Sequence, residues 1–274
     1  MPNAQWINTM ALKALLFDVD GTLADTEPHG HLPAYNEAFA EAGLDWQWGP
    51  ELYRELLLMP GGRERIQHYL EAFEPELGEH RDDVEADARA WVERIHKIKS
   101  RYFQRLVKAG KVPLRPGVRR LMREAKKRGI LIAIVTNASK RSLEPFLLYT
   151  LGEDLLKKVD FIVSGEQVKN KKPAPDLYKM ALLKLGVKAE ECIAIEDSAM
   201  GLTAARQAGI ATLITINEDT RRHDFEGAAL VVDQLGEPEE PYAILAGHSY
   251  DQGWVSIQML EEVLEDYWTR DEEE

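Results

Sequence analysis

Residues 14–23 read ALLFDVDGTL, and this stretch decides the fold. Four apolar residues come first, and a short continuous apolar run is typical of a strand buried on both faces of a sheet. Two aspartates, Asp18 and Asp20, follow at once, and a glycine and a threonine come after them. In open α/β sheets, ligands bind at the carboxyl ends of the strands. We therefore expect a first strand that ends directly at a candidate site.

Further apolar runs of strand length recur along the chain. They lie at residues 131–135, 161–163, 192–195, 211–214 and 229–232. Helical spacing of apolar residues separates several of them, at residues 117–128, 175–185 and 199–208. A glycine follows each of these helical patterns, as helix ends favour. Strands that alternate with helices predict an α/β fold with a parallel sheet covered by helices on both faces.

A helical insert interrupts this alternation. Residues 28–110 contain no convincing strand, and their patterns predict helices near 31–42, 50–58, 63–73 and 82–109. We interpret the last as one amphipathic helix of a small bundle rather than as a coiled coil. The predicted domains are a core of residues 11–27 and 111–250, an all-helical domain of residues 28–110, and a C-terminal part of residues 251–274. That last part combines an amphipathic helix, packed on the core or forming a dimer contact, with an acidic tail.

Composition and charge exclude several classes of protein. The formal net charge of −13 argues against general binding to nucleic acid or to an anionic membrane. Cys192 is the single cysteine, so an intramolecular disulfide is impossible and a cysteine-based metal site is implausible. No apolar run reaches the roughly 18 residues of a membrane span. The first ten residues lack the pattern of a secretory signal. We expect a cytoplasmic protein with no obligate protein partner.

Polar side chains gather at the predicted strand ends. Thr136, Asn137 and Ala138 follow the second strand, Lys172 precedes the fourth, and Glu196-Asp197 ends it. Together with the first pair of aspartates, these residues form one convergent set. Carboxylates this close repel unless a cation offsets them, and Mg²⁺ prefers oxygen ligands. We predict a Mg²⁺ site formed by Asp18, Asp20 and Asp197, with Glu196 as a further candidate.

This set of residues fits the transfer of a phosphoryl group. Asp18 is the candidate nucleophile, which forms an aspartyl-phosphate, and Asp20 is the candidate acid and base. Lys172 would neutralise phosphoryl charge and restrain Asp18, while the Thr136 hydroxyl and the N–H groups of residues 137 and 138 would bind the anion. Each residue alone has a plainer explanation, as a turn aspartate, a helix cap or a solvated lysine. The order of all of them together favours catalysis.

Four segments resemble the motifs of the haloacid dehalogenase superfamily. They are residues 17–23, 135–137, 172–176 and 195–201, and the likeness extends over residues 11–235. The helical insert resembles the C1 cap domain of that superfamily. The resemblance implies a Rossmann-like core, a Mg²⁺ cofactor and the catalytic roles assigned above. It also implies that Asp18 and Asp197 bind the metal through their side chains and Asp20 through its carbonyl group.

A narrower likeness lies in the insert. Residues 45–48, 53–57 and 61–66 resemble the CbbY proteins, a group related to β-phosphoglucomutase that includes phosphatases for xylulose-1,5-bisphosphate, an inhibitor of Rubisco. The sequence departs from the group at residues 58–60, which replace a stretch that is often rich in threonine. The substrate-binding residues that this resemblance implies are Glu27, His31, Tyr53, Gly62, Arg63 and Arg65, the last three of them near a second phosphate.

Three functions remain open on this reading. The first is a phosphatase that acts on a small phosphorylated sugar, with xylulose-1,5-bisphosphate as the expected substrate. The second is a phosphosugar mutase, which forms the same aspartyl-phosphate and returns the group to the sugar. The third is a catalytically silent sugar-phosphate sensor. Access of water to the aspartyl-phosphate separates the first two, and it depends on closure of the cap.

Overall fold

The computed structural model describes residues 11–59, 61–250 and 252–271, and the chain divides into two units. The α/β unit comprises the chain up to Ala24, Leu114–Leu143 and the chain from Leu151 onward. The helical unit comprises Asp25–Pro113 and Glu144–Thr150. Residues 1–10, for which no secretory signal was predicted, and residues 272–274 of the predicted acidic tail lie outside the described residues.

One sheet of seven strands forms the centre of the α/β unit, in the order β3-β2-β1-β4-β5-β6-β7. The strands are β1 (Ala14–Phe17), β2 (Leu131–Val135), β3 (Phe161–Val163), β4 (Cys192–Glu196), β5 (Ala211–Thr215), β6 (Leu230–Val232) and β7 (Ile244–Ala246). The first six are parallel, whereas β7 runs antiparallel to β6. The predicted parallel sheet is confirmed. The strand at residues 244–246 was not predicted.

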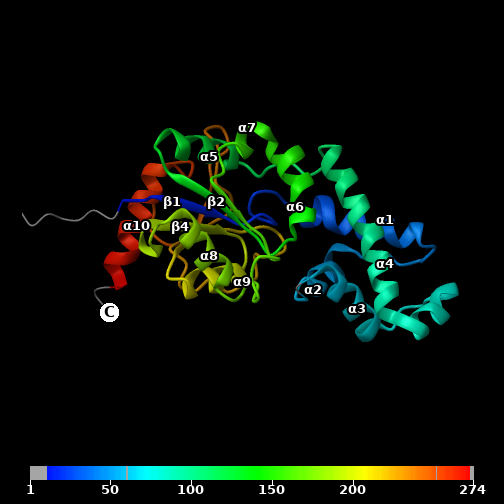
Figure 1. Cartoon of the computed structure of the whole chain (residues 1–274). Helices are drawn as coiled ribbons and strands as arrows, with labels where there is room; N and C mark the ends of the chain where they lie inside the picture. The colour runs from blue at the N-terminus through cyan, green and yellow to red at the C-terminus, as the bar shows by residue number, and fades with distance from the viewer. Residues whose placement is uncertain (1–10, 60, 251, 272–274) are drawn as a thin grey trace, which may run out of the picture. The chain divides into compact units, whose positions relative to one another are not determined.

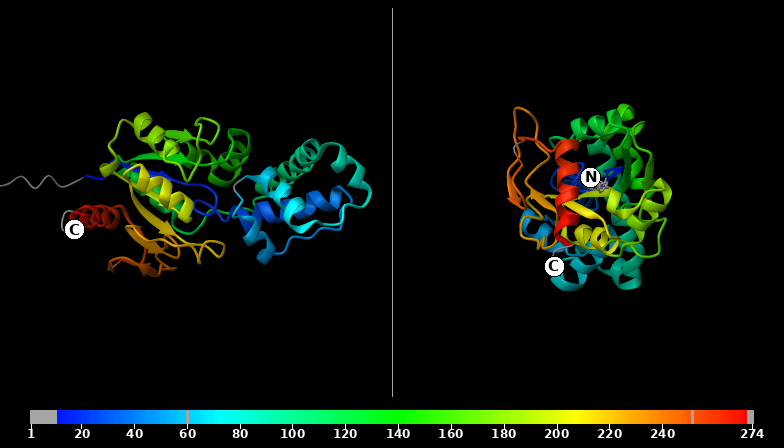
Figure 2. Two further views of the ribbon diagram at one scale, coloured as in Figure 1. Left: turned by 90° about the horizontal axis from the view of Figure 1, so that it is seen from below. Right: turned by 90° about the vertical axis from the view of Figure 1, so that its left-hand side faces the viewer.

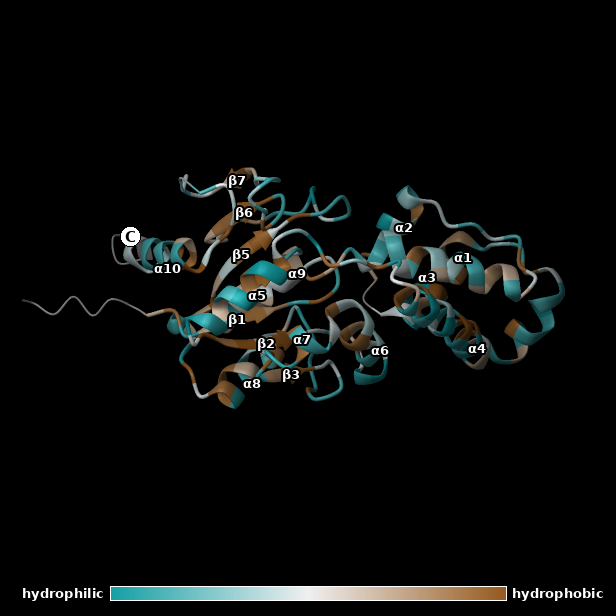
Figure 3. Ribbon diagram, turned by 90° about the horizontal axis from the view of Figure 1, so that it is seen from above, coloured by the Kyte–Doolittle hydropathy of each residue, from teal (hydrophilic) through white to brown (hydrophobic). Residues whose placement is uncertain are grey.

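Both faces of the sheet are buried, which explains the continuous apolar runs. On one face, Ala14 and Leu16 of β1 pack in a cluster with residues of α8 (Asp176–Leu185) and α9 (Ala199–Gln207). Leu15 and Phe17 alternate with them and are fully buried as well. Helix α5 (Val118–Lys127) contacts β2, on the side of the sheet opposite α8 and α9 (Figure 1). Figure 3 shows the apolar strands between helices with polar outer faces.

The segment between β2 and β3 and the C-terminal region contribute further helices. Helix α6 (Lys140–Phe146), the π-helix η3 (Leu147–Leu151) and α7 (Gly152–Leu156) lie between β2 and β3, and the short helix η4 (Ala189–Glu191) precedes β4. Helix α10 (Ile257–Asp271) contacts α5, β4 and η4 of the same chain (Figure 2). Its buried residues are Ile257, Met259, Leu260, Val263 and Leu264. The predicted C-terminal helix therefore covers the core.

The helical unit is built around an aromatic cluster. Its elements are η1 (Glu27–His31), α1 (Leu32–Glu41), α2 (Pro50–Leu56), α3 (Gly62–Phe73), η2 (Gly78–His80) and α4 (Arg81–Lys108). Trp46 and Trp48 are buried against Phe39, and Trp46 also lies 5.8 Å from Trp91 between ring centroids. This packing agrees with the amphipathic patterns of the sequence.

The long helix α4 departs from the prediction of one continuous helix. Asp87 has φ −158° and ψ 85°, values outside the helical region, so α4 is kinked there. The Asp87 side chain accepts a hydrogen bond from the N–H of Ala90 at 2.9 Å, which is the bond of an N-cap residue. The kink therefore has a local cause: Asp87 begins a new helix.

The boundaries of the two units differ in detail from the predicted domains. The helical unit begins at Asp25 rather than at residue 28, and it also includes residues 144–150, which were predicted to belong to the core. Within that unit, the hydroxyl of Thr150 donates a hydrogen bond to the Val112 carbonyl at 3.1 Å. This contact joins residues 144–150 to the end of the helical insert, and sequence periodicity contains no sign of it.

Candidate active site

The carboxyl ends of the central strands bring the predicted catalytic residues together. Phe17 of β1 pairs with Ile134 of β2 and with Ile195 of β4, so the residues that follow these three positions share one edge of the sheet. The order of the strands reverses at β1, which is the switch point where open α/β sheets bind ligands. Asp18 and Glu196 accordingly lie side by side.

Lys172 joins the carboxylates of this edge. Its ammonium Nζ donates hydrogen bonds to Asp18 Oδ1 at 2.7 Å and to Glu196 Oε1 at 2.6 Å. It also donates to the carbonyl oxygen of Val135 at 2.7 Å. The side chain is only 4% exposed, so three acceptors hold a charged group that water does not solvate. The predicted restraint of Asp18 by Lys172 is present as a direct contact.

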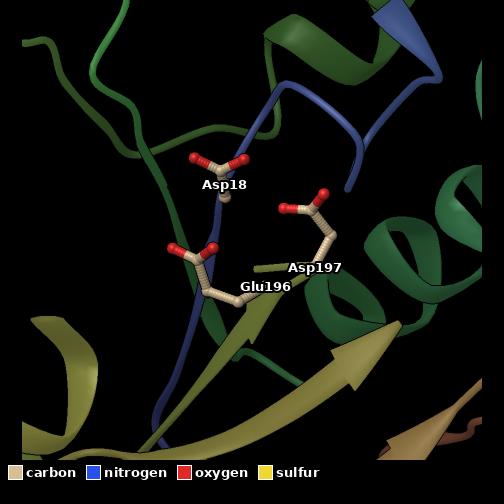
Figure 4. Close-up of side chains that lie close together, drawn as sticks. All are labelled: Asp18, Glu196 and Asp197. Carbon is tan, nitrogen blue, oxygen red and sulfur yellow. The ribbon is translucent and has the colours of Figure 1, made fainter. Parts of the chain in front are cut away.

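Three buried carboxyl groups face one space at this edge (Figure 4). One oxygen from each of Asp18, Glu196 and Asp197 lies within 4.8 Å of the others. Burial raises the pKa of Asp18 to about 8, with Lys172 opposing the shift and Glu196 adding to it. Burial also raises the pKa of Asp197 well above its ordinary value, and the charge of Asp18 contributes.

The residues of this edge fit a divalent metal ion. Three carboxylates against one lysine leave an excess of negative charge in a buried space, and a bound cation offsets such an excess. All the donors are oxygens, which is the ligand set that Mg²⁺ prefers. This acidic cluster supports a metal ion here. Among the described residues, this is the one group of at least three potential ligands that could hold a metal.

Asp20 lies near this cluster in a tight turn. The carbonyl of Val19 accepts hydrogen bonds from the N–H groups of residues 22, 23 and 24, which reverses the chain directly after β1. Asp20 is half-buried, and its charge helps to raise the pKa of Asp18. Gly21 has φ +85°, and a Cβ atom there would lie 2.2 Å from Asp197 Oδ2. Only glycine fits this position, because both the dihedral angle and the space exclude a side chain.

The residues after β2 hold the loop that carries Lys172. Thr136 is buried, and its hydroxyl oxygen accepts a hydrogen bond from the N–H of Ala138 at 3.0 Å. Asn137 accepts from the N–H of Lys172 at 2.9 Å, and its amide group also donates to the Lys172 carbonyl. The Ala138 N–H, predicted to bind the anion, is thus engaged by Thr136, and the side chain of Asn137 positions the lysine.

Sequence reasoning missed three residues of this edge. Tyr178 of α8 donates its hydroxyl proton to Glu196 Oε1, the oxygen that Lys172 also binds. Asn217, after β5, donates to Asp197 Oδ2 at 2.7 Å. Arg115 is buried and donates to the carbonyl oxygens of Gly21, Thr215, Ile216 and Asp233. Asn217 and Arg115 had a readable signal, since one lies three residues after the predicted strand 211–214 and the other stands in a proline-flanked segment near the start of the predicted core range 111–250.

The helical unit brings a second group of predicted residues together. Tyr53 donates its hydroxyl proton to Glu27 Oε2 and accepts a hydrogen bond from Arg65 at 2.8 Å. Arg65 also donates to the Leu56 carbonyl at 3.1 Å and lies 3.9 Å from Glu27. Burial and the charge of Glu27 raise the pKa of Tyr53, so its hydroxyl stays protonated.

Two of the predicted residues have partners that the sequence did not indicate. His31 Nδ1 lies 2.8 Å from Nζ of the buried Lys99, which also lies 4.7 Å from the ring centroid of Tyr35. Gly62 backs onto His96, since a Cβ atom on the glycine would lie 2.5 Å from His96 Nε2. The side chains of Arg65 and Lys99 are therefore two buried cationic groups of this unit.

Arg63 lies apart from the buried contacts of Arg65. Its side chain is 56% exposed and lies 3.6 Å from the carboxylate of Glu93. The sequence assigned Arg63 and Arg65 the same role, but the helical period turns the first to solvent and the second inward. Substitutions of Arg63 and Arg65 therefore compare an exposed arginine with a buried one on the same helix.

Comparison with known proteins adds an independent observation. The family model of the haloacid dehalogenase-like hydrolases matches residues 12–209. The chain belongs to this family. It is 45% identical over 230 residues to the protein CbbY encoded on a plasmid of Cupriavidus necator, covering 84% of this chain and 88% of that protein. The predicted membership of the CbbY group is confirmed, and the enzyme is a phosphatase.

Two further relatives define the family context. A crystal structure of a CbbY mutant from Rhodobacter sphaeroides, in complex with xylulose-(1,5)-bisphosphate, is 38% identical and has a TM-score of 0.71. The similarity covers 81% of this chain and 94% of that one. A phosphorylated carbohydrates phosphatase from Thermotoga maritima is 33% identical, covering 73% of this chain and 82% of the relative.

Within the described residues, no helix is long and apolar enough to span a membrane.

Proposed function

We propose that this enzyme is a Mg²⁺-dependent phosphatase that converts xylulose-1,5-bisphosphate to xylulose 5-phosphate. The observation that carries the proposal is the contact of Lys172 with Asp18 inside a buried acidic cluster. A carboxylate held by one ammonium at the end of a central strand is suited to attack phosphorus. The CbbY relatives, one of them in complex with this bisphosphate, support the choice of substrate.

The proposed reaction has two steps on the residues of the α/β unit. Lys172 binds Oδ1 of Asp18, so Oδ2 attacks phosphorus, and the bond from phosphorus to the sugar oxygen breaks. Asp20 gives its proton to the departing oxygen. Water then attacks the aspartyl-phosphate, Asp20 takes a proton from that water, and the bond from phosphorus to Asp18 breaks. Inorganic phosphate and free Asp18 result.

The supporting groups neutralise charge during both steps. Lys172 and the Thr136 hydroxyl would bind the phosphoryl oxygens. Asp18 and Asp197, with the carbonyl of Asp20 and Glu196 as further ligands, would hold Mg²⁺. When bound, this ion supplies positive charge to the phosphoryl group.

We also propose that the helical unit binds the second phosphate of the substrate. Two cationic side chains of this unit, Arg65 and Lys99, are buried, and charged donors of this kind bind phosphate oxygens. Glu27, His31, Tyr53 and Gly62 would contact the sugar or its far phosphate, and Arg63 would add charge from the surface. Loss of a cationic group of the helical unit should therefore weaken the binding of a bisphosphate more than that of a monophosphate.

Phosphate release by wild type and Asp18→Asn tests the proposal. We expect Mg²⁺-dependent release from xylulose-1,5-bisphosphate, and a loss of at least about 10⁴-fold in the variant because the nucleophile is gone. The metal-free variant should unfold at a higher temperature than wild type, since one of three crowded carboxylates is neutral. That result would separate lost chemistry from lost folding.

Two other results would replace the proposed function. Isomerisation of β-glucose 1-phosphate without release of phosphate from the bisphosphate would assign a mutase. Binding of the bisphosphate by wild type without turnover, under any concentration of Mg²⁺, would assign a sensor. A substrate panel scored both for phosphate and for sugar isomers distinguishes all three functions.

A further inference from the structure

The loop after β5 contacts the acidic cluster through one residue that no motif of the sequence contains. Asn217 Nδ2 donates a hydrogen bond to Asp197 Oδ2 at 2.7 Å and a longer one, at 3.4 Å, to the carbonyl of Gly21. These two acceptors belong to the segments that follow β4 and β1. Asn217 therefore connects the segments that follow β5, β4 and β1.

The orientation of the Asn217 amide is fixed by its own turn. Its Oδ1 accepts hydrogen bonds from the N–H of Asp219 at 2.9 Å and from the N–H of Thr220 at 3.1 Å. Its backbone N–H in turn donates to the Thr220 hydroxyl oxygen at 3.1 Å. Because two N–H donors occupy the oxygen, the nitrogen must be the atom that faces Asp197.

The close packing of Gly21 prevents this contact from relaxing. A Cβ atom on Gly21 would lie 2.6 Å from Asn217 Nδ2 and 2.2 Å from Asp197 Oδ2. Arg115 donates to the Gly21 carbonyl from the other side and to the carbonyl of Thr215, two residues before Asn217. The glycine turn, the amide and the carboxylate are thus held as one packed group.

We infer that Asn217 is a positioning residue for the metal site: it binds Oδ2 of Asp197 and fixes the direction in which this carboxylate presents its other oxygen. The inference rests on the proposed function, which assigns Asp197 as a ligand of Mg²⁺. A hydrogen bond from a neighbouring residue that orients a metal ligand typically affects metal affinity by about 10- to 100-fold. Asn217 would therefore act on the binding of the ion and not on the chemical step.

A purely structural role is the competing explanation. Asn217 could serve only to close the turn of residues 217–220, for which its Oδ1 suffices. The two roles use different atoms of the same amide, so they can be separated. Asn217→Ser keeps a short side-chain acceptor for the turn but is too short to reach Asp197. Thr220→Val disturbs the same turn by removing the acceptor of the Asn217 N–H and leaves the contact with Asp197 intact.

The experiment measures the affinity for Mg²⁺ of the metal-stripped, full-length enzyme, from the rise of its unfolding temperature with Mg²⁺ concentration. We expect about a 10-fold higher dissociation constant in Asn217→Ser and an unchanged constant in Thr220→Val. The Mg²⁺ concentration that half-activates phosphate release should rise equally in Asn217→Ser, while kcat at saturating Mg²⁺ returns close to the wild-type value.

The outcomes distinguish failure of the inference from failure of the proposed function. Equal Mg²⁺ affinity in wild type and Asn217→Ser, with a clear loss in Asp197→Ala, would overturn the inference alone. Unchanged affinity in Asp197→Ala would overturn the metal site itself. If Asn217→Ser does not fold, Asn217→Ala and Thr220→Val are compared instead, and equal losses of Mg²⁺ affinity in both would assign the residue to the turn only.

Discussion

The two units each bring a buried cation, a carboxylate and a buried tyrosine into mutual contact, but the α/β unit gathers two further buried carboxylates around its group. In the α/β unit, Lys172 and Tyr178 both donate to Glu196, and two more carboxylates stand nearby. In the helical unit, Arg65 donates to Tyr53 and Tyr53 donates to Glu27, with the buried Lys99 as a further cation.

The difference indicates what each unit is built to bind. A buried group of carboxylates is stable only with a cation beside it, and a buried cationic side chain favours an anion as its partner. Each unit also has an apolar core of its own. The experiments below remove one charge at a time from either side.

Among substitutions of a cation, the largest effect is expected from Lys172→Met, which removes the ammonium that contacts Asp18 and Glu196. Phosphate release should fall by about 10²- to 10³-fold, because a group that stabilises the transition state is lost. The metal-free protein should also lose about 3–5 kcal/mol of stability, because Asp18 and Glu196 lose their partner. Lys171→Met, one residue earlier and exposed, is the control. Wild-type stability of Lys172→Met in urea unfolding would contradict this description.

A smaller effect is expected from the arginines of the helical unit. Arg65→Met should raise KM for a bisphosphate by at least about tenfold, the value of one charge-assisted hydrogen bond, and KM for a monophosphate far less. It should also destabilise the protein, because Arg65 is buried beside Glu27. Arg63→Ala should show the same selective rise of KM with little change in stability, since Arg63 is exposed. Equal changes of KM for both substrates would refute the assignment of the far phosphate.

The smallest effect concerns the pH dependence of stability. Burial, with the charges of Lys99, Arg63, His31 and Arg65, lowers the pKa of His96 from 6.5 to about 4. Between these two pH values, His96 binds a proton in the unfolded chain but not in the folded protein. The free energy of unfolding therefore decreases as pH falls from about 6.5 to 4. When pH falls from 7 to 4.5, the free energy of unfolding, measured in urea, should decrease by about 1–3 kcal/mol less in His96→Gln than in wild type. An identical loss in both proteins would show that His96 takes up its proton normally.

The sequence predicted the elements that are buried on all sides. The apolar run Ala14–Phe17 and its counterparts became strands because burial on both faces requires continuous apolar residues. Strand β7 was missed for the converse reason: Leu245 is 52% exposed and its strand lies at the edge of the sheet. The kink at Asp87 was missed because the apolar period of the helix continues across it.

The residues of the candidate site also fall into those that the sequence predicted and those that it did not. Asp18, Lys172 and Asp197 could be predicted because they stand at ends of strands, or in the loop before one, in an order that the family shares. Lys99 and Tyr178 could not, because each stands at an ordinary position of a helical pattern and its partner is far away in sequence. Asn217 stands two residues after the end of β5, so extending the strand-end argument to the loop after the fifth strand would have found it.

Arg115 has a consequence for the order in which the protein is made. Its guanidinium donates to carbonyl groups that lie far apart in the sequence, from Gly21 to Asp233. Asp233 lies 118 residues after Arg115. A growing polypeptide cannot satisfy this buried group before Asp233 has left the ribosome. The turn that carries Gly21 is therefore secured late in synthesis, and a nascent chain that already contains every catalytic residue still lacks part of the support that holds them in place.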